Sequence, residues 1–324
     1  MVSASGFHML GSSPAFLRAC AAIEKMARVD ATVLVEGETG TGKEMAARAI
    51  HYKGHRCHQP FVPVNCGALA EQLVESELFG HERGAFTDAK AASLGLVHEA
   101  GGGTLFLDEI DALGPKAQAA LLRFLQDGSY RRVGGAQQRQ ADVRVIVASN
   151  ARLLELANER RFRKDLYYRV SVLSVRMPAL RERGDDGQVL AQTFLARLGR
   201  HYDRPDVTFT PDSLRFVREH DWQGNVRELE NAVHRALLLS DSNAVDLVQA
   251  VTGDSSTPPQ SQALDFKQAK SRAVADFERR YLGDLLVRTQ GNMTQAAVLA
   301  GQDRSAFGRL VRKHGLRPAR PDGV

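Results

Sequence analysis

The sequence predicts a parallel α/β domain that binds a nucleotide, followed by a smaller all-helical module with a basic surface. Three observations support this prediction. A glycine-rich loop separates a strand-like run from a helix-forming run at Thr32–Glu44, and an apolar run at Thr104–Glu109 ends in two carboxylates. Residues 264–324 hold 12 lysines and arginines against 6 aspartates and glutamates, a net charge of +6, where the whole chain has +5. Such a module points to an anionic partner, most simply nucleic acid, or to a solvated charged helix surface, and the charge alone does not decide between them.

The composition limits the class of protein. A length of 324 residues leaves room for two or three domains, and a hydrophobic content of 43% is that of a globular protein. No apolar run approaches the roughly 18 residues of a membrane span, and the first ten residues lack the pattern of a secretory signal. Cys20, Cys57 and Cys66 form no CxxC pair, which suits a cytoplasmic protein in a reducing compartment.

The first elements lead to a phosphate-binding loop. Apolar residues at a helical spacing predict a helix over residues 14–28, and Thr32–Val35 has the composition of a buried strand. The next helix begins at Lys43. Glycines between strand and helix let backbone N–H groups surround an anion, and the helix N-terminus adds partial positive charge. A dinucleotide fold is disfavoured, because the glycines run GxxGxG rather than GxGxxG.

The spacing of the loop fits the Walker A pattern, with Lys43 placed to reach the terminal phosphates. Glu44 stands where a magnesium-binding Ser or Thr is usual, so other groups must hold most of the metal. The loop residues expected to bind the nucleotide are Gly37, Glu38, Thr39, Gly40, Thr41, Gly42, Lys43 and Glu44.

Residues 51–66 contain three histidines and two cysteines, which raises zinc binding as an alternative. Their spacing matches no structural zinc pattern, so loop and strand-edge positions are the favoured interpretation. Phe61–Asn65 predicts a second strand that ends at the edge of the nucleotide site. Further on, Phe86 lies in a glycine-flanked loop, where exposed aromatics often contact partners. Folding of Phe86 back into the core is the alternative, and the residues alone do not decide.

Two further apolar runs predict buried parallel strands. The first ends in Asp108 and Glu109, and ligands of open α/β sheets bind beyond the carboxyl ends of the strands. Asp108 is therefore placed to hold magnesium, and Glu109 to accept a proton from an attacking water. The second run, Val143–Asn150, ends in the polar pair Ser149 and Asn150.

The C-terminal third is helical in pattern. Arginine-dense sequence from Arg160 leads into helical segments to about Val245, and the polar run Gly253–Gln262 is the clearest linker. Helices over residues 292–300 and 304–314, separated by Gly301, then predict a helix-turn-helix. A helical dimerisation bundle is the alternative. The residues expected to contact DNA are Arg304, Ser305, Arg309, Arg312 and Lys313.

Taken in order, the motifs GETGTGKE, GAFTDA, TLFLDE and GNVRELEN resemble those of the bacterial enhancer-binding proteins. These are AAA+ ATPases that activate RNA polymerase carrying sigma-54. The resemblance implies an AAA+ P-loop parallel sheet with a helical lid, followed by a Fis-type helix-turn-helix. The implied parts are a tail (1–8), the ATPase (9–245, its lid from about 176), a linker (246–263) and a DNA-binding domain (264–324).

The resemblance also implies roles for single residues. Lys43 binds the phosphates of ATP, Asp108 serves magnesium, and Glu109 activates water, restrained by Asn65 until the target is engaged. Asn150, with Ser149, resembles sensor I. Further implied roles are sensor II for Arg227, arginines offered to a neighbouring subunit for Arg163 and Arg169, and a second pore loop for Gln126–Gly135. Head-to-tail contacts of this kind imply a closed ring, usually a hexamer.

The expected partners are the sigma-54 RNA polymerase holoenzyme and upstream, enhancer-like DNA. The residues expected to contact sigma-54 are Gly84, Ala85, Phe86, Thr87, Asp88 and Ala89. Asp88 departs from the family's GAFTGA, which puts engagement in question but not the ATPase. No receiver domain precedes residue 9, so control is expected from a protein in trans, from expression level, or from a domain outside this sequence. The alternatives are a regulator of the same ancestry that no longer drives sigma-54, and another AAA+ remodeller such as a helicase loader or unfoldase.

Overall fold

The computed structural model describes residues 9–87, 89–252, 282, 285–286, 289, 292–301 and 303–313. The chain divides into two compact units, Met1–Asp254 and Ser255–Val324.

The first unit is built on a sheet of five parallel strands in the order β2-β3-β6-β1-β7. The strands are β1 (Val33–Glu36), β2 (Phe61–Asn65), β3 (Thr104–Asp108), β6 (Arg144–Ser149) and β7 (Leu173–Arg176). The apolar runs of the sequence form the central strands, which are buried on both sides. The pairing sets Asn65 beside Asp108 and Glu36 beside Ser149, so the polar ends of the strands meet at one edge. The predicted parallel α/β fold is confirmed.

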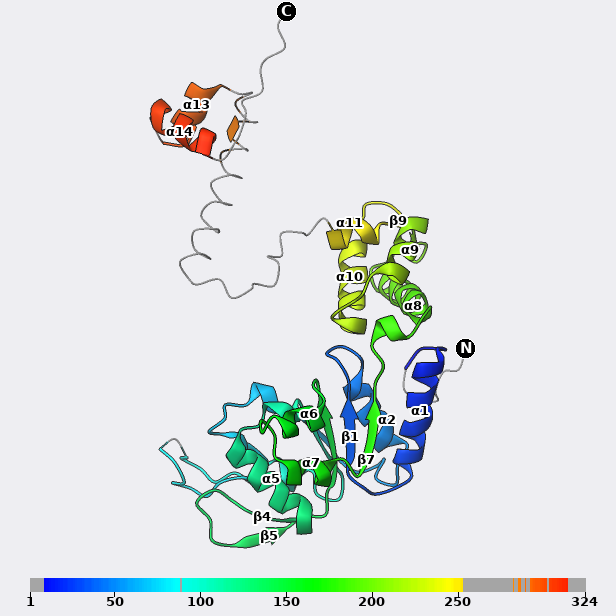
Figure 1. Cartoon of the computed structure of the whole chain (residues 1–324), viewed down its shortest axis with the longest axis vertical. Coiled ribbons are helices and arrows are strands. Elements are labelled where there is room, and N and C mark those ends of the chain that lie inside the picture. Colours follow the sequence, from blue (N-terminus) through cyan, green and yellow to red (C-terminus); the bar gives the residue numbers. More distant parts are fainter. Residues whose placement is uncertain are drawn as a thin grey trace, which may run out of the picture. The chain divides into compact units, whose positions relative to one another are not determined.

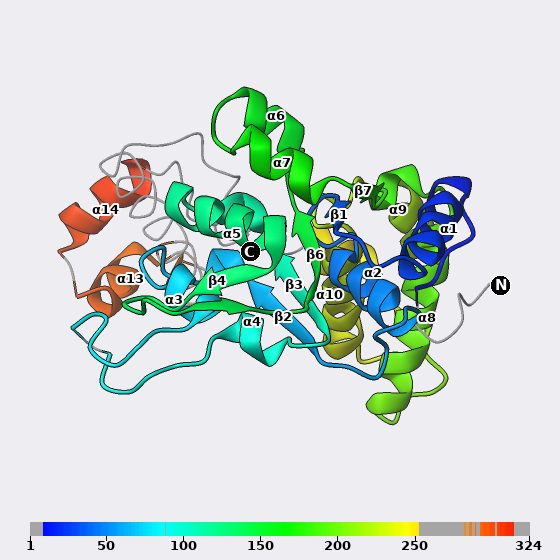
Figure 2. The same ribbon diagram turned by 90° about the horizontal axis from the view of Figure 1, so that it is seen from below.

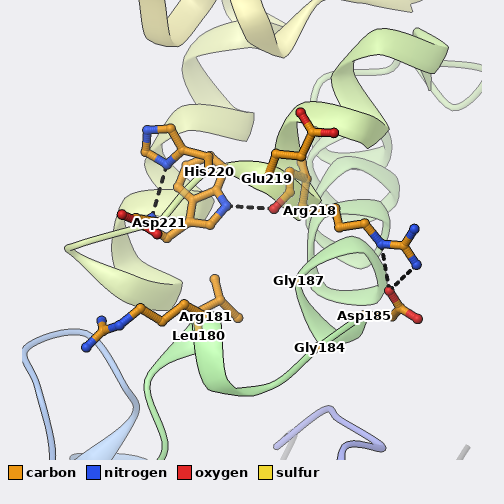
Figure 3. Close-up of a pocket in the computed structure, with 11 residues that line it drawn as sticks. Leu180, Arg181, Gly184, Asp185, Gly187, Arg218, Glu219, His220 and Asp221 are labelled. Atoms are coloured by element: carbon orange, nitrogen blue, oxygen red, sulfur yellow. Dashed lines mark hydrogen bonds and ion pairs between the residues drawn. The ribbon is translucent and has the colours of Figure 1, made fainter.

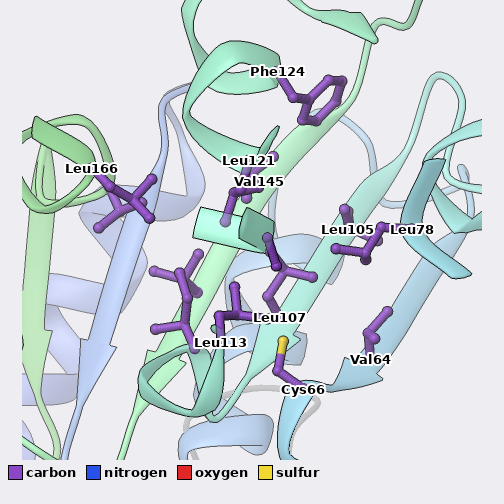
Figure 4. Packing of buried hydrophobic residues seen from close by; sticks show 14 of the residues in the cluster. Val64, Cys66, Leu78, Leu105, Leu107, Leu113, Leu121, Phe124, Val145 and Leu166 are labelled. Atoms are coloured by element: carbon purple, nitrogen blue, oxygen red, sulfur yellow. The ribbon is translucent and has the colours of Figure 1, made fainter. Parts of the chain in front are cut away.

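Helices cover both faces of this sheet (Figures 1 and 2). Helices α1 (Pro14–Ala27) and α2 (Lys43–Tyr52) pack on one face through Phe106 and Ile146. The other face carries α3 (Val74–Phe79), α4 (Leu96–Glu99), α5 (Pro115–Asp127), α6 (Leu153–Asn158) and α7 (Lys164–Val170). There Leu105, Leu107 and Val145 meet Leu121, Phe124 and Leu166 (Figure 4). Successive β3 side chains thus enter opposite cores, as alternation along a strand requires.

Shorter elements follow the strands at the site edge. The 3-10 helices η1 (Cys66–Ala68) and η2 (Ile110–Ala112) follow β2 and β3. Helix α5 ends at Gly128 with a left-handed φ of 72° and leads into an antiparallel hairpin of β4 (Ser129–Arg131) and β5 (Gln138–Gln140). Strand β4 of this hairpin lies within the predicted second pore loop, Gln126–Gly135.

A helical lid follows β7. It comprises η3 (Leu180–Glu182), α8 (Asp186–His201), α9 (Pro211–Glu219), α10 (Asn225–Leu239) and α11 (Leu247–Thr252), with the short strands β8 (Thr208–Phe209) and β9 (Ala244–Val245). Its core holds Trp222, which is 1% exposed. Residues 247–252 fall within the predicted linker (246–263). They form α11 instead, because Leu247 and Ala250 are buried in the lid core.

The second unit contains α13 (Met293–Leu299) and α14 (Arg304–Lys313), separated by Gly301 with a left-handed φ of 63°. These two helices agree with the ranges that the sequence predicts. Their shared core includes Leu282, Leu285, Leu286, Ala296, Ala297, Phe307 and Val311. In the described part of the chain, no helix is long and apolar enough to cross a membrane.

Candidate nucleotide-binding site

The phosphate-binding loop places a buried ammonium group at the carboxyl edge of the sheet. Lys43 is 6% exposed, and its Nζ donates to the carbonyl oxygens of Gly37 (2.8 Å) and Glu38 (3.1 Å) and to Asn150 Oδ1 (2.6 Å). Gly40 and Gly42 have φ values of 79° and 93°, a backbone conformation that residues with a side chain rarely adopt. Burial lowers the pKa of Lys43, although nearby carboxylates oppose this effect. A bound anion would offset that cost, because an opposite charge stabilises the protonated ammonium group.

The acidic residues follow directly from β3. Glu109 has a left-handed φ of 55°, and its N–H donates to Asp108 Oδ1 (2.9 Å). Glu109 Oε1 accepts from Asn150 Nδ2 (3.2 Å), so Asn150 contacts both Lys43 and Glu109. Ser149 Oγ donates to Asp111 Oδ1 (2.7 Å), which fixes the end of β6. The predicted loop lysine, strand carboxylates and sensor I pair are therefore brought together.

The donor atoms at this edge fit magnesium. Burial raises the pKa of Asp108 and outweighs the Glu109 N–H and Lys43, which both lower it. A cation beside Asp108 would therefore be favourable, because it would stabilise the charged carboxylate. Within the described residues no three His, Cys, Asp or Glu side chains are grouped to hold a metal ion. Magnesium commonly uses one or two carboxylates plus substrate phosphates and water, which matches Asp108.

The residues considered for zinc occupy other roles. His51 is buried, and its Nδ1 shares a hydrogen bond of 2.8 Å with Thr104 Oγ1. Cys66 is 2% exposed in the hydrophobic core, and burial raises the pKa of its thiol to about 12. His51 thus lies within helix α2 and not in a loop or at a strand edge, whereas Cys66 directly follows strand β2.

The lid closes a cavity of about 450 Å³ over this edge. Arg227, on the first turn of α10, lines the cavity with Lys43, Asp108 and Glu109. An apolar wall of the same cavity is formed by Met9, Leu10, Phe16, Met177, Leu190 and Phe194. No sequence motif indicates that these apolar residues belong to the site. They come from segments far apart in the chain, and their helical spacing indicates only core positions.

A buried ion pair holds the apolar wall in place. Asp186 accepts from the backbone N–H groups of Ser12 (2.6 Å) and Ser13 (3.1 Å), and from Arg183 Nε (3.1 Å). The Arg183 guanidinium lies 4.0 Å from the centroid of the Phe16 ring. The side chains of Arg183 and Asp186 are only 3% and 1% exposed. The start of α1 is thereby fastened to the lid.

Asn65 lies at the cavity wall, but its contacts differ from those expected. Its Oδ1 accepts from the N–H groups of Gly67 (2.8 Å) and Ala68 (3.2 Å), which caps η1. The hydrogen bond found for Glu109 comes from Asn150. Restraint of Glu109 by Asn65 therefore stays a prediction.

The two arginines expected to act in a neighbour's site do not line the cavity of their own chain. Arg163 is exposed and forms an ion pair with Asp165 (2.7 Å). Arg169 is also exposed, and donates from Nε to the carbonyl of Leu125 (2.7 Å) and from Nη2 to that of Gln126 (3.0 Å). Both are carried by, or directly precede, α7.

The GAFTDA loop is folded onto the segment that precedes β5. Gly84 N–H donates to Ala89 O (2.9 Å), which closes the loop, and Ala89 is buried. Phe86 is half-buried with its ring edge-on to His81, at 5.0 Å between centroids, so it is neither fully exposed nor in the core. Thr87 is exposed, and Asp88 lies outside the described residues. Glu82 supports the base through Arg132 (3.1 Å).

In the second unit, Arg304, Ser305 and Arg309 are exposed on α14. Arg312 and Lys313 belong to the same helix, and their side chains lie outside what the structure describes.

Comparison with known proteins places this site in a family. Residues 9–176 match the sigma-54 interaction domain, and residues 181–263 match the AAA+ ATPase lid domain. The chain is 45% identical over 273 residues to the Nif-specific regulatory protein of Azotobacter vinelandii, covering 84% of this chain and 52% of that protein. It is 42% identical over 307 residues to the transcriptional regulatory protein ZraR of Escherichia coli strain K12, covering 94% and 68%. The chain thus spans about half to two thirds of these relatives.

A similar solved structure is NtrX from Brucella abortus in complex with ATP, at 32% identity and a TM-score of 0.71, covering 95% of this chain and 69% of that one. NtrX in complex with ADP gives a TM-score of 0.72. The fold is thus an AAA+ P-loop sheet with a helical lid. The chain belongs to the sigma-54 interaction domain family of AAA+ ATPases.

Proposed function

We propose that the chain hydrolyses ATP with magnesium and uses the turnover to remodel sigma-54 RNA polymerase at a promoter. The observation that carries this proposal is the convergence of Lys43, Asp108, Glu109 and Arg227 on one cavity, beside a sheet edge built for phosphates. Similarity to NtrX, solved with ATP and with ADP, supports the nucleotide.

The residues divide the chemistry between them. The loop N–H groups and Lys43 bind the phosphates, and Asp108 would hold magnesium, which supplies charge neutralisation when bound. Glu109 accepts the proton of a water aligned with the terminal phosphate, and Asn150 orients the Glu109 carboxylate. Arg227 stabilises charge on the phosphates from the lid side. The remaining loop residues, Gly37 to Glu44, shape the cradle.

We infer a homo-oligomeric ring, because Arg163 and Arg169 are exposed and away from the cavity of their own chain. Arg163→Ala is expected to lower turnover about tenfold without loss of nucleotide binding, because this arginine acts on the site of a neighbouring subunit. Mixing this variant with Lys43→Ala should restore part of the activity, where intact arginines face intact loops. Turnover per protomer of the wild type should rise with protein concentration. A constant rate from a species that sedimentation shows to be monomeric would contradict the ring.

The GAFTDA loop is proposed as the contact with sigma-54. Phe86→Ala and Thr87→Ala should each reduce open-complex formation with sigma-54 polymerase about tenfold or more, the effect of losing a binding hot spot. ATP turnover should stay within about twofold, because these residues lie outside the cavity. Transcription from a sigma-54 promoter and ATP turnover would be measured together.

Asp88→Gly is the informative comparison in that assay. It should change open-complex yield only moderately if the loop of the wild type is competent. A silent wild type together with an active Asp88→Gly would support the alternative function, a regulator of the same family that no longer drives sigma-54.

The second unit is proposed as a Fis-type helix-turn-helix that binds upstream DNA. The exposed arginines of α14 and the net charge of +6 over residues 264–324 support this assignment. Phosphate contacts by such residues release counterions, so affinity should fall steeply with salt. Control by a protein in trans is part of the same proposal.

A further inference from the structure

Glu38 lies in the phosphate-binding loop, but its carboxylate binds the lid. Arg181 of η3 donates to both carboxylate oxygens, with Nη1 at 2.7 Å from Oε2. Asn225 Nδ2 also donates to Oε2, at 3.2 Å. Only the backbone carbonyl of Glu38 contacts Lys43. One residue thus joins the phosphate-binding lysine to two lid elements.

Asn225 completes this junction. It is fully buried, with a left-handed φ of 53°, and its Nδ2 also donates to the carbonyl of Thr39 (3.0 Å). Its Oδ1 accepts from the N–H of Leu180 (2.8 Å), at the start of η3. The next residue, Val226, donates its N–H to the carbonyl of Gly40 (3.1 Å). The first turn of α10 is therefore bonded directly to the phosphate-binding loop.

The fit at this junction leaves no space. A Cβ at Gly40 would lie 2.1 Å from the carbonyl oxygen of Gly224, in the segment before α10. Figure 3 shows Arg181 extending from the edge of a lid cavity of about 240 Å³ toward the phosphate-binding loop. The same cavity is lined by Arg218 and Trp222. Helix α10 can therefore move relative to the loop only if these hydrogen bonds break; otherwise the loop and the helix move together.

The Glu38–Arg181 pair is better suited to positioning than to stability. The two side chains are 39% and 42% exposed, and pairs of that exposure contribute little to folding. A two-pronged contact does fix geometry. The hydrogen bond from Arg181 lowers the pKa of Glu38 to about 2, so the carboxylate is charged throughout the physiological range.

We propose that Glu38, Arg181 and Asn225 are positioning residues that couple the lid to the phosphate-binding loop. Arg227 follows Asn225 by two residues on the same helical turn, so the junction sets the place of Arg227 relative to the phosphates. Nucleotide occupancy of the loop is thereby transmitted to the lid. This inference rests on the proposed ATPase function for its kinetic readout, but not for its spectroscopic one.

The experiment is a double-mutant cycle in the full chain, with Glu38→Gln, Arg181→Met and both together. Each single variant should lower kcat about tenfold and change the affinity for a fluorescent ATP analogue less than about threefold. The double variant should match the singles, because both remove the same contact. The kcat of Arg181→Lys should lie between those of the wild type and Arg181→Met. Lysine keeps the positive charge but cannot donate to both carboxylate oxygens in the planar geometry of arginine. Additive losses, or losses confined to affinity, would overturn the coupling.

Arg218→Met is the matched control. Arg218 forms an exposed pair with Asp185 (2.7 Å) on the far side of the same lid cavity and does not contact the loop. Its kcat should equal that of the wild type. A tenfold loss in Arg218→Met would show that any lid arginine has this effect.

Trp222, the single tryptophan of the chain, supplies the second readout. Binding of ATP should change its emission in the wild type and in Arg218→Met, and this response should be lost in Glu38→Gln even when the nucleotide is bound. A wild type without turnover would refute the proposed ATPase, while the emission cycle would still decide the coupling. Bound nucleotide without any change in wild-type emission would overturn the coupling itself.

Discussion

Glu109→Gln is expected to lower ATP turnover by about 10²–10⁴-fold, the usual contribution of a positioned general base. The amide keeps the size of the side chain and can still bond Asn150, but it cannot accept a proton from water. Affinity for ATP should stay within a few-fold, because the phosphates are bound by the loop and Lys43. Single-turnover hydrolysis and equilibrium binding of a fluorescent ATP analogue would measure the two effects separately.

Lys43→Ala is the companion variant. It removes the buried ammonium group that contacts Gly37, Glu38 and Asn150, so binding itself should weaken. The contrast between weakened binding and slowed hydrolysis identifies the two roles. Near-normal turnover in Glu109→Gln would refute the assignment of the base.

Asp186→Ala is expected to destabilise the first unit by about 3–5 kcal/mol, the cost of leaving a buried charge without its partner. The variant would leave the Arg183 side chain, which is 3% exposed, without its carboxylate partner. It would also remove the acceptor for the N–H groups of Ser12 and Ser13. Denaturant unfolding followed by Trp222 fluorescence would measure the free energy of unfolding. The neighbouring Asp185→Ala is the control, because its pair with Arg218 is exposed and should contribute less than about 1 kcal/mol. Equal losses in the two variants would contradict the role of the buried pair.

The effect of Asp186 should also depend on pH. Burial raises the pKa of this carboxyl, but the hydrogen bonds from Ser12, Ser13 and Arg183 outweigh burial and hold the pKa below its ordinary value. A lowered folded-state pKa stabilises the protein above the unfolded value of about 4, and this contribution is lost as the pH falls through the folded-state value. The advantage of wild type over Asp186→Ala should therefore be full near neutral pH and shrink below about pH 4.

The phosphate half of the site could be predicted because its signals are local. Lys43, Asp108 and Asn150 each end or follow an apolar run, and parallel strands bring such ends to one edge. The apolar half could not, since Phe16 and Phe194 belong to ordinary amphipathic helices. The same holds for Arg181 and Glu38, which are 143 residues apart and meet only through the fold. Strand β7 is short and lies in arginine-dense sequence, which hid it among the helical segments.

The bond between Ser12 and Asp186 also bears on the order in which the protein is made. It joins residues 174 positions apart, so the chain from β1 to η3 must be synthesised before the bond can form. Closing a long loop costs little more than closing a shorter one, because the entropy grows only with the logarithm of its length. Timing is the stricter constraint, since domains fold during synthesis from the N-terminus. The sheet around the phosphate-binding loop can thus be complete once β7 has been synthesised, whereas the wall formed by Met9 and Leu10 is completed only after α8 has left the ribosome.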